Sequence, residues 1–297
     1  MRRMMRRTLL LGVAAATFGV GLLVPAPAAV LAAPAAGPTP ALAYQASAAA
    51  MRAAGGAYAG WAASRHFLAF STRDDGTAAE VVGDLATADR IAVVVPGVDS
   101  TLATFTSGLG GVARRAPATQ ARAVYDAALA ADPAARVAVV AWLGYDPPEG
   151  VGLEAAREVR ARAGARNLAA FAGWLAARRP DARITLVGHS YGAVVVGLAA
   201  PRLPHQVTAL IAVGAPGMGA DDVAGLHTRA AVYAALAPTD WIGRIPQARF
   251  LGLGLGTRPA TPSFGAAALP TTGVQGHDYY FSPGTATLAA IAAVVTR

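Results

Sequence analysis

Residues 184–196 read ITLVGHSYGAVVV, a short apolar run followed by the pattern Gly-x-Ser-x-Gly and a second apolar run. The first run is rich in β-branched residues, as expected of a buried parallel strand, and the second can continue as a helix. A serine nucleophile must stand clear of its own backbone, and a sharp turn between a strand and a helix would expose Ser190 in this way. Such a turn brings the neighbours of the serine into close contact, so Gly188 and Gly192, which lack side chains, fit there.

The alternative interpretation of this stretch is a tight turn that holds an inert serine. With 33 glycines in 297 residues, one Gly-x-Ser-x-Gly pattern arises by chance in about one such chain in ten. Its position between an expected strand and an expected helix favours the nucleophile.

Length and composition indicate a folded protein with one sizeable core. The chain has 297 residues, of which 55% are hydrophobic and 14% charged, and this excludes a disordered class. It has no cysteine, which excludes disulfides, thiol catalysis and cysteine metal sites. The net charge is +8, but four of the basic residues fall within the first seven positions and the others are scattered among acids. Without a basic stripe interleaved with aromatics, we expect no nucleic-acid partner.

The N-terminus has the pattern of an export signal. Basic residues 1–7 precede 17 uncharged, mostly apolar residues, and small residues and prolines follow. We therefore predict a signal peptide over residues 1–32, and the pair Arg6-Arg7 resembles the twin-arginine type. An uncleaved membrane anchor is the alternative, although 17 residues is short for a span. We expect a secreted or cell-envelope protein with no stable membrane span once the signal is removed.

The remaining chain alternates strand and helix patterns. Residues 33–65 read as an Ala/Pro-rich leader and an N-terminal helix broken around Gly55-Gly56, and residues 66–297 as one domain. The expected strands cover residues 67–71, 80–82, 91–95, 137–142, 184–187, 209–213 and 231–236, and the expected helices cover 119–131, 153–178, 191–198 and 286–295. Repeated β-α-β units predict the α/β class, with a mostly parallel sheet covered by helices on both faces.

In such a sheet, functional side chains gather in loops beyond the carboxyl ends of the strands. The loop after the strand at 91–95 begins Pro96-Gly97, and its turn could aim a backbone N–H at the space above the serine. We expect the N–H groups of Val98 and Tyr191 to form an oxyanion hole. A simple turn in which Asp99 or Ser100 caps the next helix fits the same loop.

The other two catalytic groups are expected later in the chain. Asp240 follows the last expected strand, where a carboxylate that orients a histidine belongs, while Asp221 and Asp222 follow the preceding strand and are rivals. His277 lies in the loop before the last helix and completes the order Ser, Asp, His. The side chain of His189, next to the serine, is expected to leave the turn in a different direction and to be poorly placed as a base.

These residues carry a family resemblance. The motifs are FLAF at 67–70, VVVPGV at 93–98, AWLGY at 141–145, GHSYG at 188–192 and HDYY at 277–280. With them the chain resembles the α/β-hydrolase superfamily, and within it an actinobacterial group of secreted α/β hydrolases formerly labelled a domain of unknown function. The resemblance implies the α/β-hydrolase fold and a nucleophile at Ser190, with His277 and Asp240 completing a triad. One departure is Pro96-Gly97, which stands where lipases usually have His-Gly.

The sequence thus predicts a serine hydrolase that cleaves carboxylic esters, small-molecule or lipid, through an acyl-enzyme. No metal or organic cofactor is expected, since metal-ligand spacings and a phosphate-binding glycine loop are absent from the sequence. An inactive hydrolase-fold binding or cell-envelope protein, and an amidase or peptidase with the same triad, are the alternatives. Residues 145–152 and 251–273 are expected to select the substrate, with Phe264 and Leu269 as an apolar cover.

Overall fold

The computed structural model describes residues 37–247 and 253–297. The predicted signal peptide at residues 1–32 and the start of the predicted leader lie outside these ranges. None of the helices in the described ranges combines the length and the apolar character that a membrane span requires.

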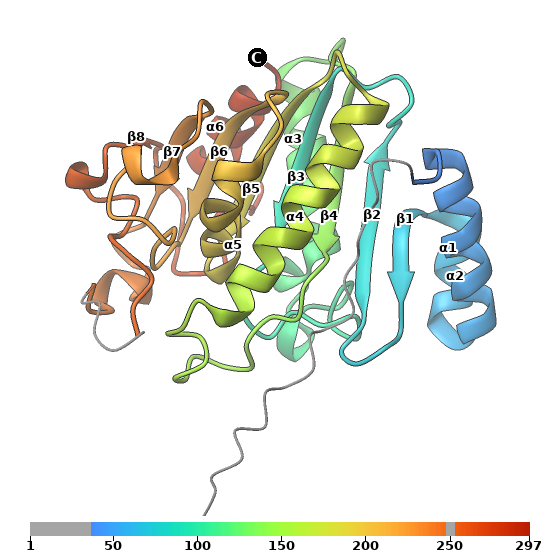
Figure 1. Cartoon of the computed structure of the whole chain (residues 1–297), viewed down its shortest axis with the longest axis horizontal. Helices are drawn as coiled ribbons and strands as arrows, with labels where there is room; N and C mark the ends of the chain where they lie inside the picture. Colours follow the sequence, from blue (N-terminus) through green and yellow to red (C-terminus); the bar gives the residue numbers. More distant parts are fainter. Residues whose placement is uncertain (1–36, 248–252) are drawn as a thin grey trace, which may run out of the picture.

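An eight-stranded sheet forms the centre of the protein, with strand order β1-β2-β4-β3-β5-β6-β7-β8 (Figure 1). β1 pairs antiparallel with β2, and β2 with β4, while all other neighbours are parallel. The predicted α/β-hydrolase fold with a mostly parallel sheet is therefore confirmed. The strands are β1 His66–Ser71, β2 Thr77–Gly83, β3 Arg90–Val95, β4 Val137–Leu143, β5 Arg183–His189, β6 Val207–Val213, β7 Ala231–Ala235 and β8 Ala267–Ala268.

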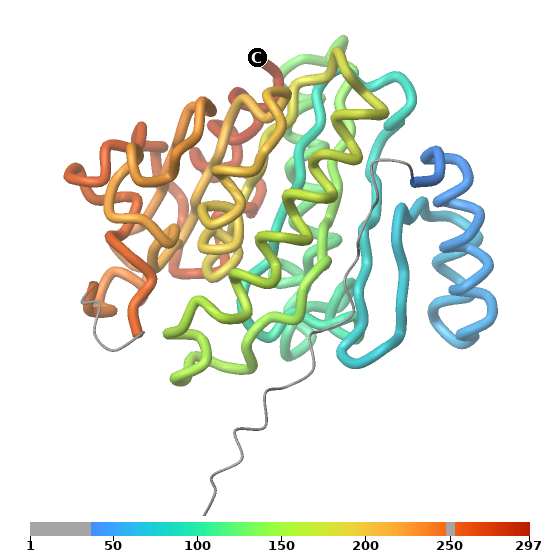
Figure 2. The backbone as a smooth tube through the Cα atoms, viewed as in Figure 1, coloured from blue at the N-terminus to red at the C-terminus, as the bar shows by residue number. Residues whose placement is uncertain are grey.

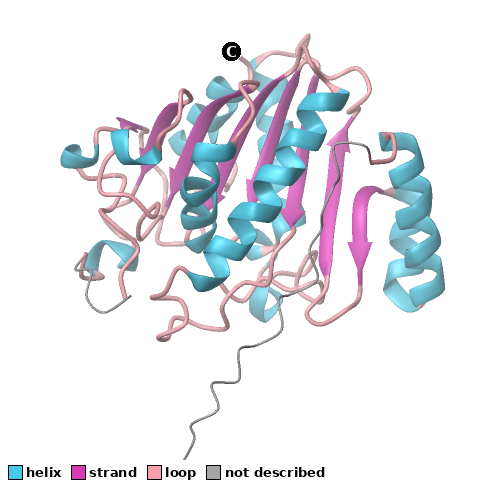
Figure 3. Cartoon of the chain, viewed as in Figure 1, coloured by secondary structure: helices cyan, strands magenta, loops and turns pink. Residues whose placement is uncertain are grey.

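Helices cover the sheet on both faces, as Figure 3 shows by colour. α4 and α5 pack together on one face, and α3 and α6 pack together on the other (Figure 1). The α-helices are α1 Pro40–Ala54, α2 Gly56–Ser64, α3 Pro117–Ala131, α4 Val159–Arg178, α5 Tyr191–Ala199 and α6 Ala286–Val295. Short 3-10 turns are Leu109–Gly111, Ala113–Arg115, Ala200–Arg202, Ala224–Leu226, Trp241–Arg244 and Pro262–Phe264.

The two N-terminal helices cover the outer edge of the sheet. They are separated at Gly55, whose φ of 73° is in the region that favours glycine, so the predicted break is present. α1 packs against β1, and the Trp61 ring of α2 stacks on Phe67 with ring centroids 5.7 Å apart. The backbone trace in Figure 2 shows these helices and the segment around β8 at opposite edges of the sheet.

The helix expected from residue 153 begins only at Val159, so this boundary was wrong. The buried hydroxyl of Tyr191 accepts a hydrogen bond from the Ala161 N–H at 3.1 Å and donates one to the Arg157 carbonyl at 2.6 Å. This hydroxyl satisfies an N–H of the first turn, which has no acceptor within a helix. Residues 150–158 are thereby left as irregular chain beside the carboxyl ends of the strands.

The central strands are buried on both faces. In β3, Val93 and Val95 belong to the core layer under α4 and α5, while Ala92 and Val94 belong to the layer under α3 and α6. Such strands expose little besides their ends, so functional side chains must come from the loops that follow them.

Candidate active site

Ser190 occupies the turn between β5 and α5 with φ 55° and ψ −126°. A positive φ is uncommon for a residue with a side chain. The flanking glycines are required by space. A Cβ at Gly188 would lie 2.4 Å from the Ala193 Cα, and one at Gly192 would lie 2.2 Å from the Val95 carbonyl oxygen. The sharp strand-to-helix turn expected from the sequence is therefore present.

The loop after β3 lies directly against the serine. A Cβ at Gly97 would come within 2.8 Å of the Ser190 Cβ. The structure thus brings Val98, the next residue, beside Ser190, and both line the same two cavities. Tyr191 is the first residue of α5, and the first N–H groups of a helix have no acceptor within it.

Hydrogen bonds to the segment that follows β4 hold the loop at residues 96–99 in place. The buried Tyr145 hydroxyl donates to the Pro96 carbonyl at 2.7 Å. Asp99, with φ 59°, donates its N–H to the Pro148 carbonyl at 3.0 Å and accepts from the Gly150 N–H at 2.6 Å. The Asp99 carboxylate therefore joins two loops of the site and does not cap a helix.

Asp240 and His277 are hydrogen-bonded to each other. The His277 Nδ1 lies 3.0 Å from both carboxylate oxygens, and Asp240 is only 2% exposed. Burial alone would raise the pKa of Asp240, but the hydrogen bond and charge of His277, with hydrogen bonds from Tyr280 and the Ile242 N–H, outweigh it and lower that pKa. The carboxylate is thus held ionised and oriented toward the imidazole.

The rival acids lie elsewhere. Asp221 and Asp222 are exposed, and the Asp222 carboxylate accepts the Gly225 N–H at 2.7 Å at the start of a 3-10 turn. Of the three candidates, Asp240 is the one that contacts His277.

Tyr280 hydrogen-bonds to the Asp240 carboxylate, and the sequence analysis did not single it out. Its hydroxyl donates to the Asp240 Oδ2 at 2.6 Å and accepts the Ala237 N–H at 3.0 Å. Burial, together with the hydrogen bond to Asp240, raises the pKa of Tyr280 far above its ordinary value. Gly214 makes room here, since a Cβ on it would lie 2.8 Å from the Tyr280 ring and 3.0 Å from the Asp240 Oδ2. The HDYY motif contained the signal for Tyr280.

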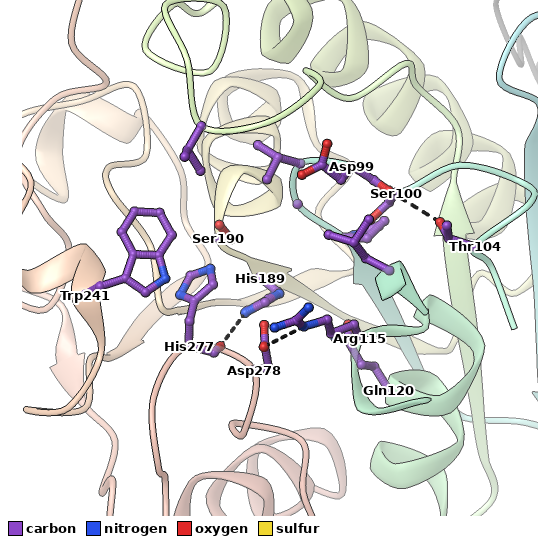
Figure 4. Close-up of a pocket in the computed structure, with 15 residues that line it drawn as sticks. Asp99, Ser100, Thr104, Arg115, Gln120, His189, Ser190, Trp241, His277 and Asp278 are labelled. Atoms are coloured by element: carbon purple, nitrogen blue, oxygen red, sulfur yellow. Dashed lines mark hydrogen bonds and ion pairs between the residues drawn. The ribbon is translucent and has the colours of Figure 1, made fainter. Parts of the chain in front are cut away.

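His189 hydrogen-bonds to the backbone of His277. Its Nε2–H donates to the His277 carbonyl at 2.9 Å, and the two rings lie 4.8 Å apart. Burial, reinforced by the nearby His277, lowers the pKa of His189 from 6.5 to about 4, so this ring is neutral at pH 7. Figure 4 shows the His277 ring between His189 and Trp241, whose ring centroid is 5.1 Å from that of His277. His189 is thus placed to position His277, a contact that its place in the sequence did not reveal.

Two cavities meet at Ser190. Both are lined by Ser190, Val98, Val151 and Trp241. The polar cavity of about 330 Å³, drawn in Figure 4, also contains side chains that hydrogen-bond: Asp99, Ser100, Thr104, Arg115, Gln120, His189, His277 and Asp278. The apolar cavity of about 290 Å³ is otherwise walled by Gly152, Ala155, Ala156, Tyr191, Pro216, Ile242, Ile245, Pro246 and residues 253–256.

Only part of the expected substrate-selecting chain lines these cavities. Val151, Gly152 and residues 253–256 do so. Phe264 and Leu269, expected as an apolar cover, are not in the described lining of either cavity. Phe264 is 1% exposed and packs in the core, and Leu269 donates its N–H to the Ala234 carbonyl beside β7. The Phe264 side chain belongs to the core layer under α4 and α5, and the Leu269 side chain packs against the layer under α3 and α6.

Across residues 37–247 and 253–297, no three side chains of the kinds that bind metals come together.

Comparison with known proteins identifies the family. The family model described as alpha/beta hydrolase matches residues 71–250, and the chain belongs to this family.

Its curated relatives are mycobacterial. An uncharacterized protein of Mycobacterium tuberculosis is 30% identical over 249 residues, which cover 74% of this chain and 37% of the relative. An uncharacterized protein of Mycobacterium bovis is 34% identical over 152 residues, 47% of this chain and 52% of the relative. The chain thus spans well under two thirds of the length of these relatives.

Among solved structures, dienelactone hydrolase from Anabaena variabilis is similar over 78% of this chain and 94% of its own, at 16% identity and a TM-score of 0.47. A Trichoderma reesei cutinase is similar over 70% of this chain and 77% of its own, at 16% identity and a TM-score of 0.40.

Proposed function

We propose that this α/β hydrolase is a serine hydrolase that cleaves carboxylic esters through an acyl-enzyme on Ser190. The observation that carries the proposal is the hydrogen bond of 3.0 Å between buried Asp240 and His277, a histidine that lines the same cavity as a serine on a strained turn. A nucleophile, a base and an orienting acid are the three groups that this reaction requires.

In the proposed mechanism, the Ser190 hydroxyl attacks the ester carbonyl. Because Nδ1 of His277 is bonded to Asp240, Nε2 is the nitrogen free to take the serine proton. The backbone N–H groups of Val98 and Tyr191 stabilise the negative oxygen of the tetrahedral intermediate. His277 then gives the proton to the leaving alcohol, and water, activated by the same nitrogen, releases the acyl group.

A neutral His189 favours proton uptake by His277. The imidazolium that forms on His277 is stabilised by the Asp240 carboxylate, whereas a second positive charge 4.8 Å away would oppose it. With its pKa lowered to about 4, His189 carries no such charge near neutral pH.

A panel of p-nitrophenyl esters of increasing acyl length, offered to the wild type and to Ser190→Ala, tests the proposal. We expect hydrolysis by the wild type and a loss of at least about 10³-fold in the variant. Matched amide substrates in the same panel test for an amidase or peptidase. No turnover of any ester would contradict the proposal and favour an inactive binding protein.

We also propose that the protein is exported and acts in the cell envelope or outside it, on the support of the basic and apolar pattern in residues 1–32. N-terminal sequencing of the protein recovered from culture medium should begin near residue 33. An intact Met1 in a membrane pellet would contradict export with cleavage.

A further inference from the structure

We infer that the substrate is an ester of a polyhydroxylated alcohol, with its acyl chain in the apolar cavity and its alcohol half in the polar cavity, where Gln120 and Arg115 bind its hydroxyl groups. This inference rests on the proposed ester hydrolysis and adds the class of substrate.

The position of His277 decides which half of the ester lies on which side. His277 lines the polar cavity, and the described lining of the apolar cavity does not include it. In ester cleavage the histidine must hand its proton to the oxygen of the leaving alcohol. The alcohol half therefore lies on the polar side, and the acyl half extends into the other cavity.

Gln120 is a buried acceptor without a donor. It is 2% exposed and lines the polar cavity, and its Nε2 donates to the Arg114 carbonyl at 3.1 Å. Its Oε1 has no hydrogen-bond partner among the described residues. Leaving a buried acceptor unpaired costs stability, so such a group in a binding cavity points to a ligand that donates a hydrogen bond.

Arg115 supplies the complementary donors. Its Nε donates to the Asp278 carboxylate at 2.7 Å, and Figure 4 shows its guanidinium beside Asp278, extending toward His189. The ion pair has no net charge and presents both donors and an acceptor to the cavity. The Ser100 and Thr104 hydroxyls in the same lining can do either.

This mixture favours hydroxyl groups over an anion. A hydroxyl donates one hydrogen bond and accepts others. One hydroxyl can therefore donate to Gln120 or to Asp278 and at the same time accept from Arg115. A phosphate or carboxylate would accept from Arg115 but would face the Asp278 carboxylate and the Gln120 oxygen. A neutral polyol, either a glycerol-like alcohol or a sugar, is the ligand whose groups match.

The apolar cavity suits a hydrocarbon chain. Its described walls include Val151, Ala155, Ala156 and Leu253, and no charged side chain is among them. Burial of apolar surface in such a cavity favours an acyl chain of several carbons.

Esters that share one acyl group and differ only in the alcohol test the inference. We would measure kcat/KM for 1-octanoylglycerol against propyl octanoate, and for 6-O-octanoyl methyl glucoside against cyclohexylmethyl octanoate. The wild type should prefer the hydroxylated member of at least one pair by about tenfold or more. The preferred pair identifies the alcohol as glycerol-like or as a sugar.

Two variants connect the preference to the residues. Gln120→Met removes the acceptor at similar size, and Arg115→Met removes the donors at a more exposed position. Each should reduce the preference at least about fivefold. Gln206→Met is the matched control, because Gln206 also has a buried oxygen without a partner among the described residues but does not line either cavity, and it should keep the wild-type preference.

The outcomes separate the two levels of the argument. If the wild type cleaves the alkyl esters without preferring the hydroxylated ones, or if both Gln120→Met and Arg115→Met fold and keep the preference, the inference is overturned while ester hydrolysis stands. Preference for an octanoyl ester of glycerol 3-phosphate over octanoylglycerol would also overturn it. If no ester is cleaved, the proposed function itself fails.

Discussion

The two sides of Ser190 are built differently. On the base side, the loops around Asp240 and His277 are joined by hydrogen bonds between side chains and backbone, and the carboxylate is 2% exposed. On the apolar side, the wall comes mostly from loops and a short 3-10 turn at residues 151–156, 241–246 and 253–256, and Val151 is 67% exposed.

The difference separates chemistry from selection. Proton transfer needs groups held to within a fraction of an ångström, and a dense hydrogen-bond network provides this. A hydrocarbon chain needs only a water-excluding surface of suitable size. Substitutions at Asp240, His277 and their hydrogen-bond partners should therefore affect the rate for every ester, while those on the apolar side should change which acyl length is preferred.

The largest expected effect tests the base side. His277→Ala should lower kcat/KM about 10³- to 10⁴-fold for short and long acyl esters alike, because the serine loses its base. Steady-state kinetics across the acyl panel measures this, with circular dichroism to verify the fold. His205→Ala, at an exposed position outside both cavities, is the control and should stay near wild-type activity. A loss confined to one acyl length would show that His277 acts on substrate selection and not on the chemical step.

The second effect concerns stability and pH. Burial, with His277 nearby, lowers the pKa of His189 in the folded protein to about 4. Between pH 6.5 and 4, His189 is therefore protonated in the unfolded chain but neutral in the folded protein. Stability from this group is present above pH 6.5 and is lost as the pH falls toward 4, by about 3 kcal/mol. His189→Gln should therefore show a flatter decline in the free energy of unfolding between pH 6.5 and 4.

Denaturant unfolding at several pH values measures that decline. The matched control is His205→Gln, at an exposed position, which should follow the wild-type slope. Equal slopes for the wild type and His189→Gln would show that His189 does not carry this pH dependence.

A smaller effect is expected from the support of the acid. Tyr280→Phe removes the 2.6 Å hydrogen bond to Asp240, which should raise the pKa of that carboxyl and loosen its hold on His277. We expect kcat/KM to fall about tenfold, with the loss of activity on the acid side beginning at a higher pH than in the wild type.

The neighbouring tyrosine offers a matched control for this change. Tyr279→Phe removes a hydroxyl from a residue whose ring lies against Arg114 and which forms no hydrogen bond to Asp240 among the described residues. Its pH profile should match that of the wild type. A Tyr280→Phe profile that also matches would assign Tyr280 to packing alone.

The smallest effect tests the apolar side. Ala155→Leu places a larger side chain in the apolar cavity and should lower kcat/KM for decanoate esters about three- to tenfold while leaving acetate esters nearly unaffected. Ala130→Leu, on the exposed side of α3, is the control for the substitution itself. An equal loss for all acyl lengths would mean that the apolar wall affects the chemical step. It would contradict the proposed difference between the two sides of Ser190.

The fold and the strand-to-helix turn at Ser190 could be predicted from sequence because strong local patterns encode them. Runs of β-branched residues predicted the buried strands. The Gly-x-Ser-x-Gly spacing predicted the glycines' role, because backbone atoms lie too close to Gly188 and Gly192 for a side chain to fit. α6 was found at its predicted bounds, since Ala286–Val295 is apolar with a threonine before it.

What could not be predicted depends on contacts between distant segments. The start of α4 depends on the Tyr191 hydroxyl, 30 residues away from Ala161 in sequence. Gln120 and Arg115 precede the serine by a long stretch, and no local pattern shows that they share a cavity with it. The two-residue strand β8 is too short to produce an alternating pattern.

The central claim is that Ser190 is the nucleophile, and covalent labelling tests it most directly. The protein would be treated with a fluorophosphonate, digested with trypsin and analysed by mass spectrometry. Cleavage after Arg183 and Arg202 gives a peptide in which Ser190 is the only serine. We predict one adduct per chain, located on Ser190 and absent from Ser190→Ala. Ester hydrolysis that persists in Ser190→Ala, or an adduct on another residue of the active protein, would contradict the account.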